Sequence, residues 1–138
     1  MNDARQLQRF VEAQAASYAD ALAELRNGHK RTHWMWFVFP QIAGLGHSAM
    51  AQRYAIASRD EAAAYLAHDV LGPRLRACTQ AMLSVPDRTA NEILGTPDDI
   101  KFRSSMTLFD AVAPNDVFAE ALARFYRGQR DPATLERL

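Results

Sequence analysis

The stretch HWMWFVFPQ, residues 33–41, contains both tryptophans of the chain and two of its seven phenylalanines. A basic cluster, Arg26–Arg31, precedes the stretch, and a loop with two glycines, Gly44 and Gly46, follows it. So much aromatic surface must either be buried in a core or cover a ligand or a partner. The polar side chains at its two ends, His33 and Gln41, indicate a site at this place in the chain.

An apolar run of this length is compatible with a strand or with a short buried helix. We expect a helix that is capped by Thr32 and ends at Pro40. No other segment has the pattern of a partner strand, and a lone strand would leave its backbone groups unpaired. The two tryptophans cannot face the same way on such a helix. We therefore expect one of them to pack in the core and the other to line a cavity or an interface.

Apolar residues recur at helical spacing along the rest of the chain. Capping residues and helix breakers place the expected helix starts near Leu7, Ser17, Ser48, Ser58, Asp69, Thr89, Thr96, Asn115 and Asp131. Some of these pieces can join into one bent helix. The sequence therefore predicts an all-α fold over residues 1–138, a compact single-domain bundle of about six to eight helices with orthogonal or irregular packing.

The composition excludes several classes of protein. The 138 residues are 49% hydrophobic and 23% charged, an ordinary globular mixture, and they suit one domain. The 16 basic and 16 acidic residues balance, which argues against general nucleic-acid binding. The single cysteine, Cys78, rules out a disulfide within the chain and favours a reducing compartment. Without a signal peptide or a membrane-spanning run, we expect a cytoplasmic protein that does not bind membranes.

The helix expected over residues 97–113 carries the sharpest chemical signal. Its apolar stripe comprises Phe102, Met106, Phe109 and Ala113. Lys101 and Ser105 lie on a flank of this apolar surface, four residues apart, so that their side chains meet. Ser104 lies at the edge. The polar residues expected on the opposite, solvated side are Arg103, Thr107 and Asp110.

A lysine within an apolar surface is costly to bury unless something pairs with it. The partner of Lys101 can be a carboxylate, a helix C-terminus or an anionic ligand. The alternative is that Lys101 extends to solvent and Ser105 bonds its own backbone. A catalytic Ser-Lys pair is a weak hypothesis, because the familiar Ser-x-x-Lys order is absent.

The glycine loop offers a second candidate contact for a ligand. Gly44 and Gly46 let the backbone approach a ligand closely, and the helix that begins after Ser48 offers free N–H groups suited to an anion. The loop lacks the Gly-Lys-Ser/Thr element of a P-loop and the third glycine of a dinucleotide-binding fingerprint. The alternative is a tight connection between two helices.

The histidines and the cysteine give weaker signals. His33 can act as a general base or a hydrogen-bond donor, or it can be a helix-terminal histidine bonded to a backbone carbonyl. The spacing of the four histidines is not that of a zinc-binding helix, so we expect no metal and no other cofactor. Cys78 falls on an apolar stripe and is expected to be a buried hydrophobe and not a nucleophile.

Two long motifs, residues 32–41 and residues 101–109, together resemble a bacterial family of unknown function, the domain-of-unknown-function family numbered eighteen-ten. The loop 44–48 and the segment 64–72 also fit its pattern, so the resemblance spans nearly the whole chain. It implies a compact, mainly helical fold in a bacterial cytoplasm and no established activity. Members are often mislabelled as calpastatin, but this chain shows no sign of a disordered, repetitive protease inhibitor.

Together these observations predict a pocket between the aromatic run, the glycine loop and the Lys101 helix. We expect it to bind a small polar or anionic ligand, such as a nucleotide. The expected ligand-binding residues are His33, Trp36, Gln41, Gly44, Gly46, Ser48, Lys101, Ser104 and Ser105. One alternative is a protein-interaction module with an exposed tryptophan. Another is a small enzyme in which His33 or Lys101 carries the proton.

Overall fold

The computed structural model of the protein describes residues 3–138, with side chains from Gln6 onward. Over these residues it contains ten helices and no strand. The helices are α1 (Asp3–Ala15), α2 (Tyr18–Arg26), α3 (Met35–Val38), α4 (Ala49–Arg53), α5 (Arg59–Ala67), α6 (Leu71–Ser84), α7 (Ala90–Leu94), α8 (Asp98–Val112), α9 (Val117–Tyr126) and α10 (Pro132–Glu136). The all-α prediction is confirmed. The expected six to eight helices are too few, because four of the ten are single turns of four or five residues.

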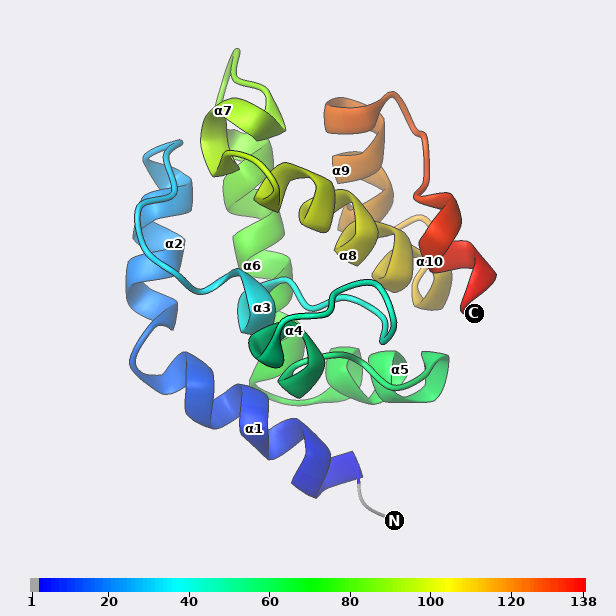
Figure 1. Cartoon of the computed structure of the whole chain (residues 1–138). Coiled ribbons are helices and arrows are strands. Elements are labelled where there is room, and N and C mark those ends of the chain that lie inside the picture. The colour runs from blue at the N-terminus through cyan, green and yellow to red at the C-terminus, as the bar shows by residue number, and fades with distance from the viewer. Residues whose placement is uncertain (1–2) are drawn as a thin grey trace.

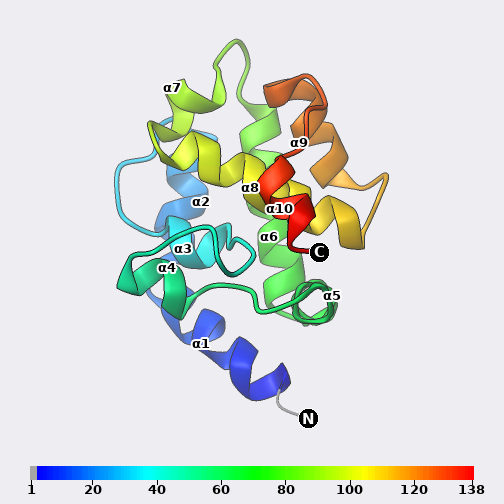
Figure 2. The same ribbon diagram turned by 45° about the vertical axis from the view of Figure 1, so that its right-hand side comes forward.

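Helix α8 lies at the centre of the fold. It packs against α5, α7, α9 and α10, while α6 packs against α2, α5 and α9 (Figure 1). Turned by 45°, the molecule shows the C-terminal helix α10 lying across α8 (Figure 2). The only extended pairing in the described range is an isolated parallel bridge between Ile42 and Ile56, which holds the chain on either side of α4. None of the described helices combines the length and the apolar character needed to cross a membrane.

The face of α8 that was expected to be solvated is instead buried. Thr107 is 0% exposed and Asp110 is 5% exposed. The segment that leads into α10 covers this face, because the Asp131 backbone N–H donates to Thr107 Oγ1 at 2.9 Å and Arg130 Nε donates to Asp110 Oδ2 at 2.8 Å. Arg103, at the rim, donates from its guanidinium to two carbonyls of the same segment. A polar helix face is therefore buried here because a second chain segment satisfies most of its hydrogen bonds, although Asp110 Oδ1 has no partner in the described range.

The aromatic run forms the short helix α3 followed by an irregular turn, which confirms a helix over a strand. Trp34, 1% exposed, and Phe39, 1% exposed, pack in the core, and Phe39 makes an edge contact with Phe102 of α8 at 4.8 Å between ring centroids. The expected cap is wrong: Trp34, not Thr32, is the N-cap residue of α3, and the Thr32 hydroxyl donates to Glu24 Oε2 at 2.7 Å.

Three of the expected helix starts are confirmed as N-caps whose side chains accept a hydrogen bond from a backbone N–H of the helix: Ser48, Ser58 and Thr89. Three other helix starts differ from the prediction. Ser17 precedes α2 but makes no capping bond, Pro97 takes the N-cap position of α8 expected for Thr96, and Asp116 caps α9 where Asn115 was expected. Asn115 instead has φ of +64°. Asparagine tolerates this left-handed conformation, and so it forms the turn while the next residue forms the cap.

Candidate functional site

Helix α3 is held in one orientation by two polar side chains, the half-buried Glu24 and the buried Gln14. Glu24 of α2 accepts hydrogen bonds from the backbone N–H groups of Arg31 and Thr32 and, at 2.9 Å, from the indole Nε1 of Trp34. Gln14 of α1, 1% exposed, donates to the carbonyl oxygen of Phe37 at 2.6 Å. These contacts direct Trp34 into the core and leave the neighbouring Trp36 half-buried at the surface. The expectation that the two tryptophans divide in this way is confirmed.

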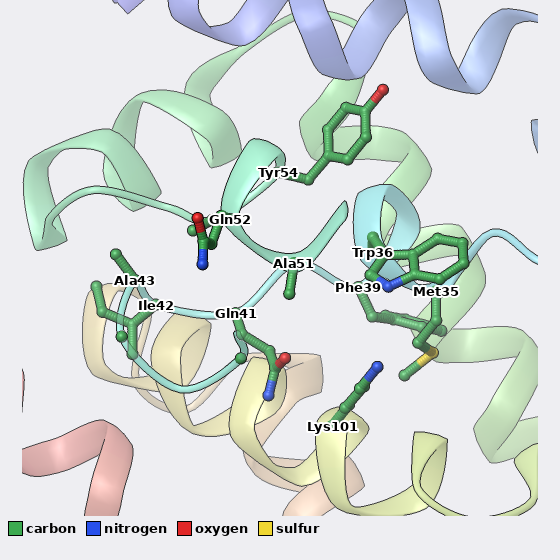
Figure 3. Close-up of a pocket in the computed structure, with 13 residues that line it drawn as sticks. Met35, Trp36, Phe39, Gln41, Ile42, Ala43, Ala51, Gln52, Tyr54 and Lys101 are labelled. Atoms are coloured by element: carbon green, nitrogen blue, oxygen red, sulfur yellow. The ribbon is translucent and has the colours of Figure 1, made fainter. Parts of the chain in front are cut away.

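Trp36 forms one wall of a cavity of about 160 Å³. The cavity lies between α3, the loop that follows it, α4 and the first turns of α8 (Figure 3). It is lined by Met35, Trp36, Phe39, Gln41, Ile42, Ala43, Gly44, Gly46, Ala51, Gln52, Tyr54, Ala55 and Lys101. The lining is mostly apolar, and Lys101 is its one charged residue within the part of the chain that the structure describes.

Three polar groups of this lining have unused hydrogen-bonding capacity. Among the described residues, the ammonium of Lys101, the side-chain amide of Gln41 and the indole N–H of Trp36 have no hydrogen-bond partner. Figure 3 shows the Lys101 amine reaching toward the indole of Trp36, with Gln41 beside it, whereas Tyr54 turns its hydroxyl away. The Lys101 Nζ lies 5.8 Å from the centroid of the Trp36 ring, a cation–π distance.

The two lysines of the chain differ in their partners. Lys30 Nζ forms an ion pair with Asp98 Oδ2 at 3.0 Å. Lys101 makes no ion pair with any residue that the structure describes. A cation at the wall of an apolar cavity, with no protein counter-charge, is suited to an anionic ligand.

The glycine loop closes the cavity on the side opposite Trp36. Gly44 has φ of +99°, a conformation that other residues rarely adopt. A Cβ atom on Gly46 would lie 2.6 Å from the Cβ of Ala51, so this position has no room for a side chain. The loop is also tied to the C-terminus, because Arg137 donates to the Gly44 carbonyl at 3.3 Å.

A second, more open depression of about 290 Å³ adjoins the cavity. It is lined by Gln41, Leu45, Gly46, Pro97, Ile100, Lys101, Ser104, Asp131 and Ala133. Gln41, Gly46 and Lys101 belong to both linings. The Ser104 hydroxyl donates to Asp131 Oδ2 at 2.9 Å. Burial acts to raise the pKa of the Asp131 carboxyl, but hydrogen bonds from Thr134 and Ser104 outweigh it and hold this pKa below its ordinary value.

The structure brings most of the predicted site residues together. Trp36, Gln41, Gly44, Gly46 and Lys101 line the cavity, and Ser104 lines the adjoining depression.

The other three predicted residues lie outside both linings. His33 is exposed. Ser48 caps α4 by accepting from the Ala51 N–H. Ser105 is 0% exposed, and its hydroxyl has no hydrogen-bond partner in the described range, so the alternative in which it bonds its own backbone is wrong.

Sequence reasoning missed Asp131 as a site residue. It was recognised only as the start of the last helix, and nothing local connects it with Lys101. The described residues contain no group of three or more potential metal ligands. Burial raises the pKa of the Cys78 thiol to about 12, in keeping with the expected inert cysteine.

Comparisons with known proteins place these features in a family. A family model described as "Protein of unknown function (DUF1810)" matches residues 4–138. The chain is also similar to the conserved hypothetical protein Rv1873 from Mycobacterium tuberculosis, whose crystal structure it matches with a TM-score of 0.94 and 53% sequence identity. That match covers 96% of this chain and 95% of the other. No curated protein matches the chain.

Proposed function

Because the chain belongs to the DUF1810 family of proteins of unknown function, we propose a function from its cavity: binding of a small anionic ligand that carries one planar ring, such as a pyrimidine nucleotide. The observation that carries the proposal is the position of Lys101. Its ammonium faces the cavity beside Trp36, without a protein counter-ion in the described range. An anion bound there supplies the missing charge.

The volume of the cavity restricts the ring. A dry protein cavity of about 150 Å³ holds one benzene molecule. The cavity beside Trp36 is of this size, about 160 Å³. A single pyrimidine ring therefore fills the cavity, whereas the second ring of a purine extends beyond it. Trp36 offers aromatic surface to the ring, and the amide of Gln41 offers a donor and an acceptor to its edge.

Thermal-shift and calorimetric titration with uridine monophosphate test the proposal. We expect saturating ligand to raise the melting temperature by several degrees, because a ligand at 100 times its Kd adds about 2.7 kcal/mol. Lys101→Gln is expected to abolish most of this shift. Arg31→Gln is the matched control, because it removes one exposed positive charge whose guanidinium makes no hydrogen bond in the described structure and lies in neither lining.

The same titration with adenosine monophosphate tests the size of the ring. We expect adenosine monophosphate to bind more weakly than uridine monophosphate. A panel of nucleotides, sugar phosphates and coenzymes extends the screen. If none of them shifts the melting temperature by about 1 °C or more, the binding function is overturned. An equal loss of binding in Lys101→Gln and Arg31→Gln also contradicts it, because the effect is then one of net charge and not of the site.

The two alternatives, a protein-interaction module and a small enzyme, have less support than the binding of a small anionic ligand. A protein-interaction module needs an exposed tryptophan, but Trp34 is 1% exposed and Trp36 is half-buried at the cavity wall. An enzyme with His33 as proton carrier needs that side chain in the site, but His33 lines neither the cavity nor the adjoining depression. Lys101 is the one candidate proton carrier that faces the proposed ligand.

A further inference from the structure

We propose that the depression beside the cavity binds a sugar through Asp131 and Ser104, so that the ligand is a pyrimidine nucleotide sugar. This inference rests on the proposed function and extends it. The ring occupies the cavity at Trp36, the phosphates lie at Lys101, and the hydroxyl groups of the sugar bond to Asp131 and Ser104.

The two hollows form one continuous site because they share walls. Gln41, Gly46 and Lys101 line both of them. Lys101 therefore stands at the junction, with the aromatic cavity on one side and the carboxylate of Asp131 on the other. A ligand that uses both hollows has its anionic part in the middle, between a ring and a third group.

Asp131 and Ser104 are arranged as hydrogen-bond acceptors. Asp131 Oδ2 accepts from the hydroxyls of Ser104, at 2.9 Å, and Thr134, at 2.6 Å. Asp131 Oδ1 accepts from no side chain in the described structure, and the oxygen of Ser104, whose proton is already donated, has lone pairs to offer. Two neighbouring acceptors of this kind suit two hydroxyl donors of a sugar.

The acceptor pair is also fixed in place before a ligand arrives. Ser104 is 3% exposed and is part of the central helix α8. The Asp131 backbone N–H donates to Thr107 Oγ1 at 2.9 Å, and Arg130 beside it forms an ion pair with Asp110 at 2.7 Å. Binding therefore requires little ordering of these two side chains, which favours affinity.

The charges at this place favour a neutral polyol over a charged group. A second phosphate or carboxylate in the depression meets the negative charge of Asp131. An ammonium group meets the positive charge of Lys101, which lines the same hollow. Hydroxyl groups donate to Asp131 without either repulsion. The depression, about 290 Å³, has the larger volume of the two hollows, as a sugar requires.

Calorimetric titration of the whole protein with UDP-glucose and with UDP tests the inference. We expect UDP-glucose to bind about tenfold more tightly, as a hydrogen bond to a charged acceptor gives. Asp131→Asn is expected to remove most of this preference and to leave the affinity for UDP unchanged or slightly higher. Asp116→Asn is the matched control, because Asp116, like Asp131, is the N-cap residue of a helix and its carboxylate accepts hydrogen bonds, but it lines neither hollow. It is expected to keep the preference.

Asparagine can still accept from Ser104 and Thr134, so Asp131→Asn is expected to fold, and its melting temperature checks this. If it does not fold, Ser104→Ala, which keeps the Thr134 contact, takes its place. Equal affinity of the unmodified protein for UDP-glucose and UDP overturns the sugar site and leaves the proposed function standing. A loss of affinity for both nucleotides in Asp131→Asn likewise overturns the sugar site and leaves the proposed function standing. If neither nucleotide binds, the sugar proposal fails, and the thermal-shift panel decides the proposed function separately.

Discussion

Lys101 and Trp36 face each other at the edge of one cavity, with 5.8 Å between the Lys101 Nζ and the centroid of the indole ring. One residue comes from the central helix α8, and the other comes from the four-residue helix α3. The pair is half-buried, so its contribution to stability is small, about 0.5–1 kcal/mol. Its importance lies in the cation and the aromatic surface that it presents together to a ligand.

The two tryptophans are expected to respond in opposite ways to substitution. Trp34→Phe leaves part of a core site empty and removes the indole donor to Glu24, and so should cost about 2–4 kcal/mol of unfolding free energy. Trp36→Phe should cost less than about 1 kcal/mol, because its ring is half-buried and its N–H makes no bond in the described structure. Urea denaturation measures both. Equal costs would contradict the division of the pair into a core residue and a cavity wall.

Two neighbouring hydroxyls on α8 should also differ. Ser105→Ala removes a buried hydroxyl that has no partner in the described range, so we expect unchanged or higher stability. Thr107→Val removes a donor to the Arg103 carbonyl and the acceptor of the Asp131 N–H, which should cost about 1–3 kcal/mol. Differential scanning calorimetry of the two variants gives the comparison. A destabilised Ser105→Ala protein would show that this hydroxyl has a partner after all.

Acid should weaken the hydrogen bonds through which Glu24 holds α3 in place. Burial acts to raise the pKa of this carboxyl, but hydrogen bonds from Arg31, Thr32 and Trp34 lower it from 4.5 to about 2. A carboxyl whose pKa is depressed by folding stabilises the fold above its unfolded value and loses that contribution as the pH falls toward its folded value. The unfolding free energy of the unmodified protein should therefore exceed that of Glu24→Gln by its full amount at pH 6. This difference should shrink as the pH falls from about 4.5 to about 2. Denaturation of both proteins across this range measures it, and a constant difference would argue against the carboxylate as the anchor.

Gly72 is expected to tolerate no side chain. A Cβ atom there would lie 2.2 Å from the carbonyl oxygen of Leu66, a backbone atom that cannot rotate away. Gly72→Ala should therefore cost about 2 kcal/mol or more, since α5 and α6 must move apart. In Gly95→Ala the new Cβ meets nothing within 4 Å, and the cost is limited to the positive φ of +79°, about 1 kcal/mol. Thermal denaturation should rank the two variants in this order.

Cys78 should not react in the native protein. It is 0% exposed, and burial raises the pKa of its thiol to about 12, so thiolate is scarce at neutral pH. We expect no labelling by a thiol reagent at pH 8 within the time that labels the same protein fully in 6 M guanidinium chloride. Fast labelling of the folded protein would mean that α6 opens readily.

The local structure followed from the residues themselves. Apolar spacing marked the long helices, and Ser48, Ser58 and Thr89 identified three helix starts, because a cap bonds to N–H groups of its own helix within three residues. The cavity residues Trp36, Gln41 and Lys101 were also identified in advance. An aromatic run with polar ends and a lysine within an apolar surface are visible in the sequence before any fold is known.

Only the tertiary structure decided which polar groups are buried and which of them share a site. The polar face of α8 is covered because Arg130 and Asp131 bring partners to Asp110 and Thr107 from the far end of the chain. The same segment carries Asp131 to the hollow beside Lys101. Helical periodicity gives the direction in which a side chain points along its own helix. It says nothing of which distant segment will meet that side chain, because long-range contacts arise from packing the whole core.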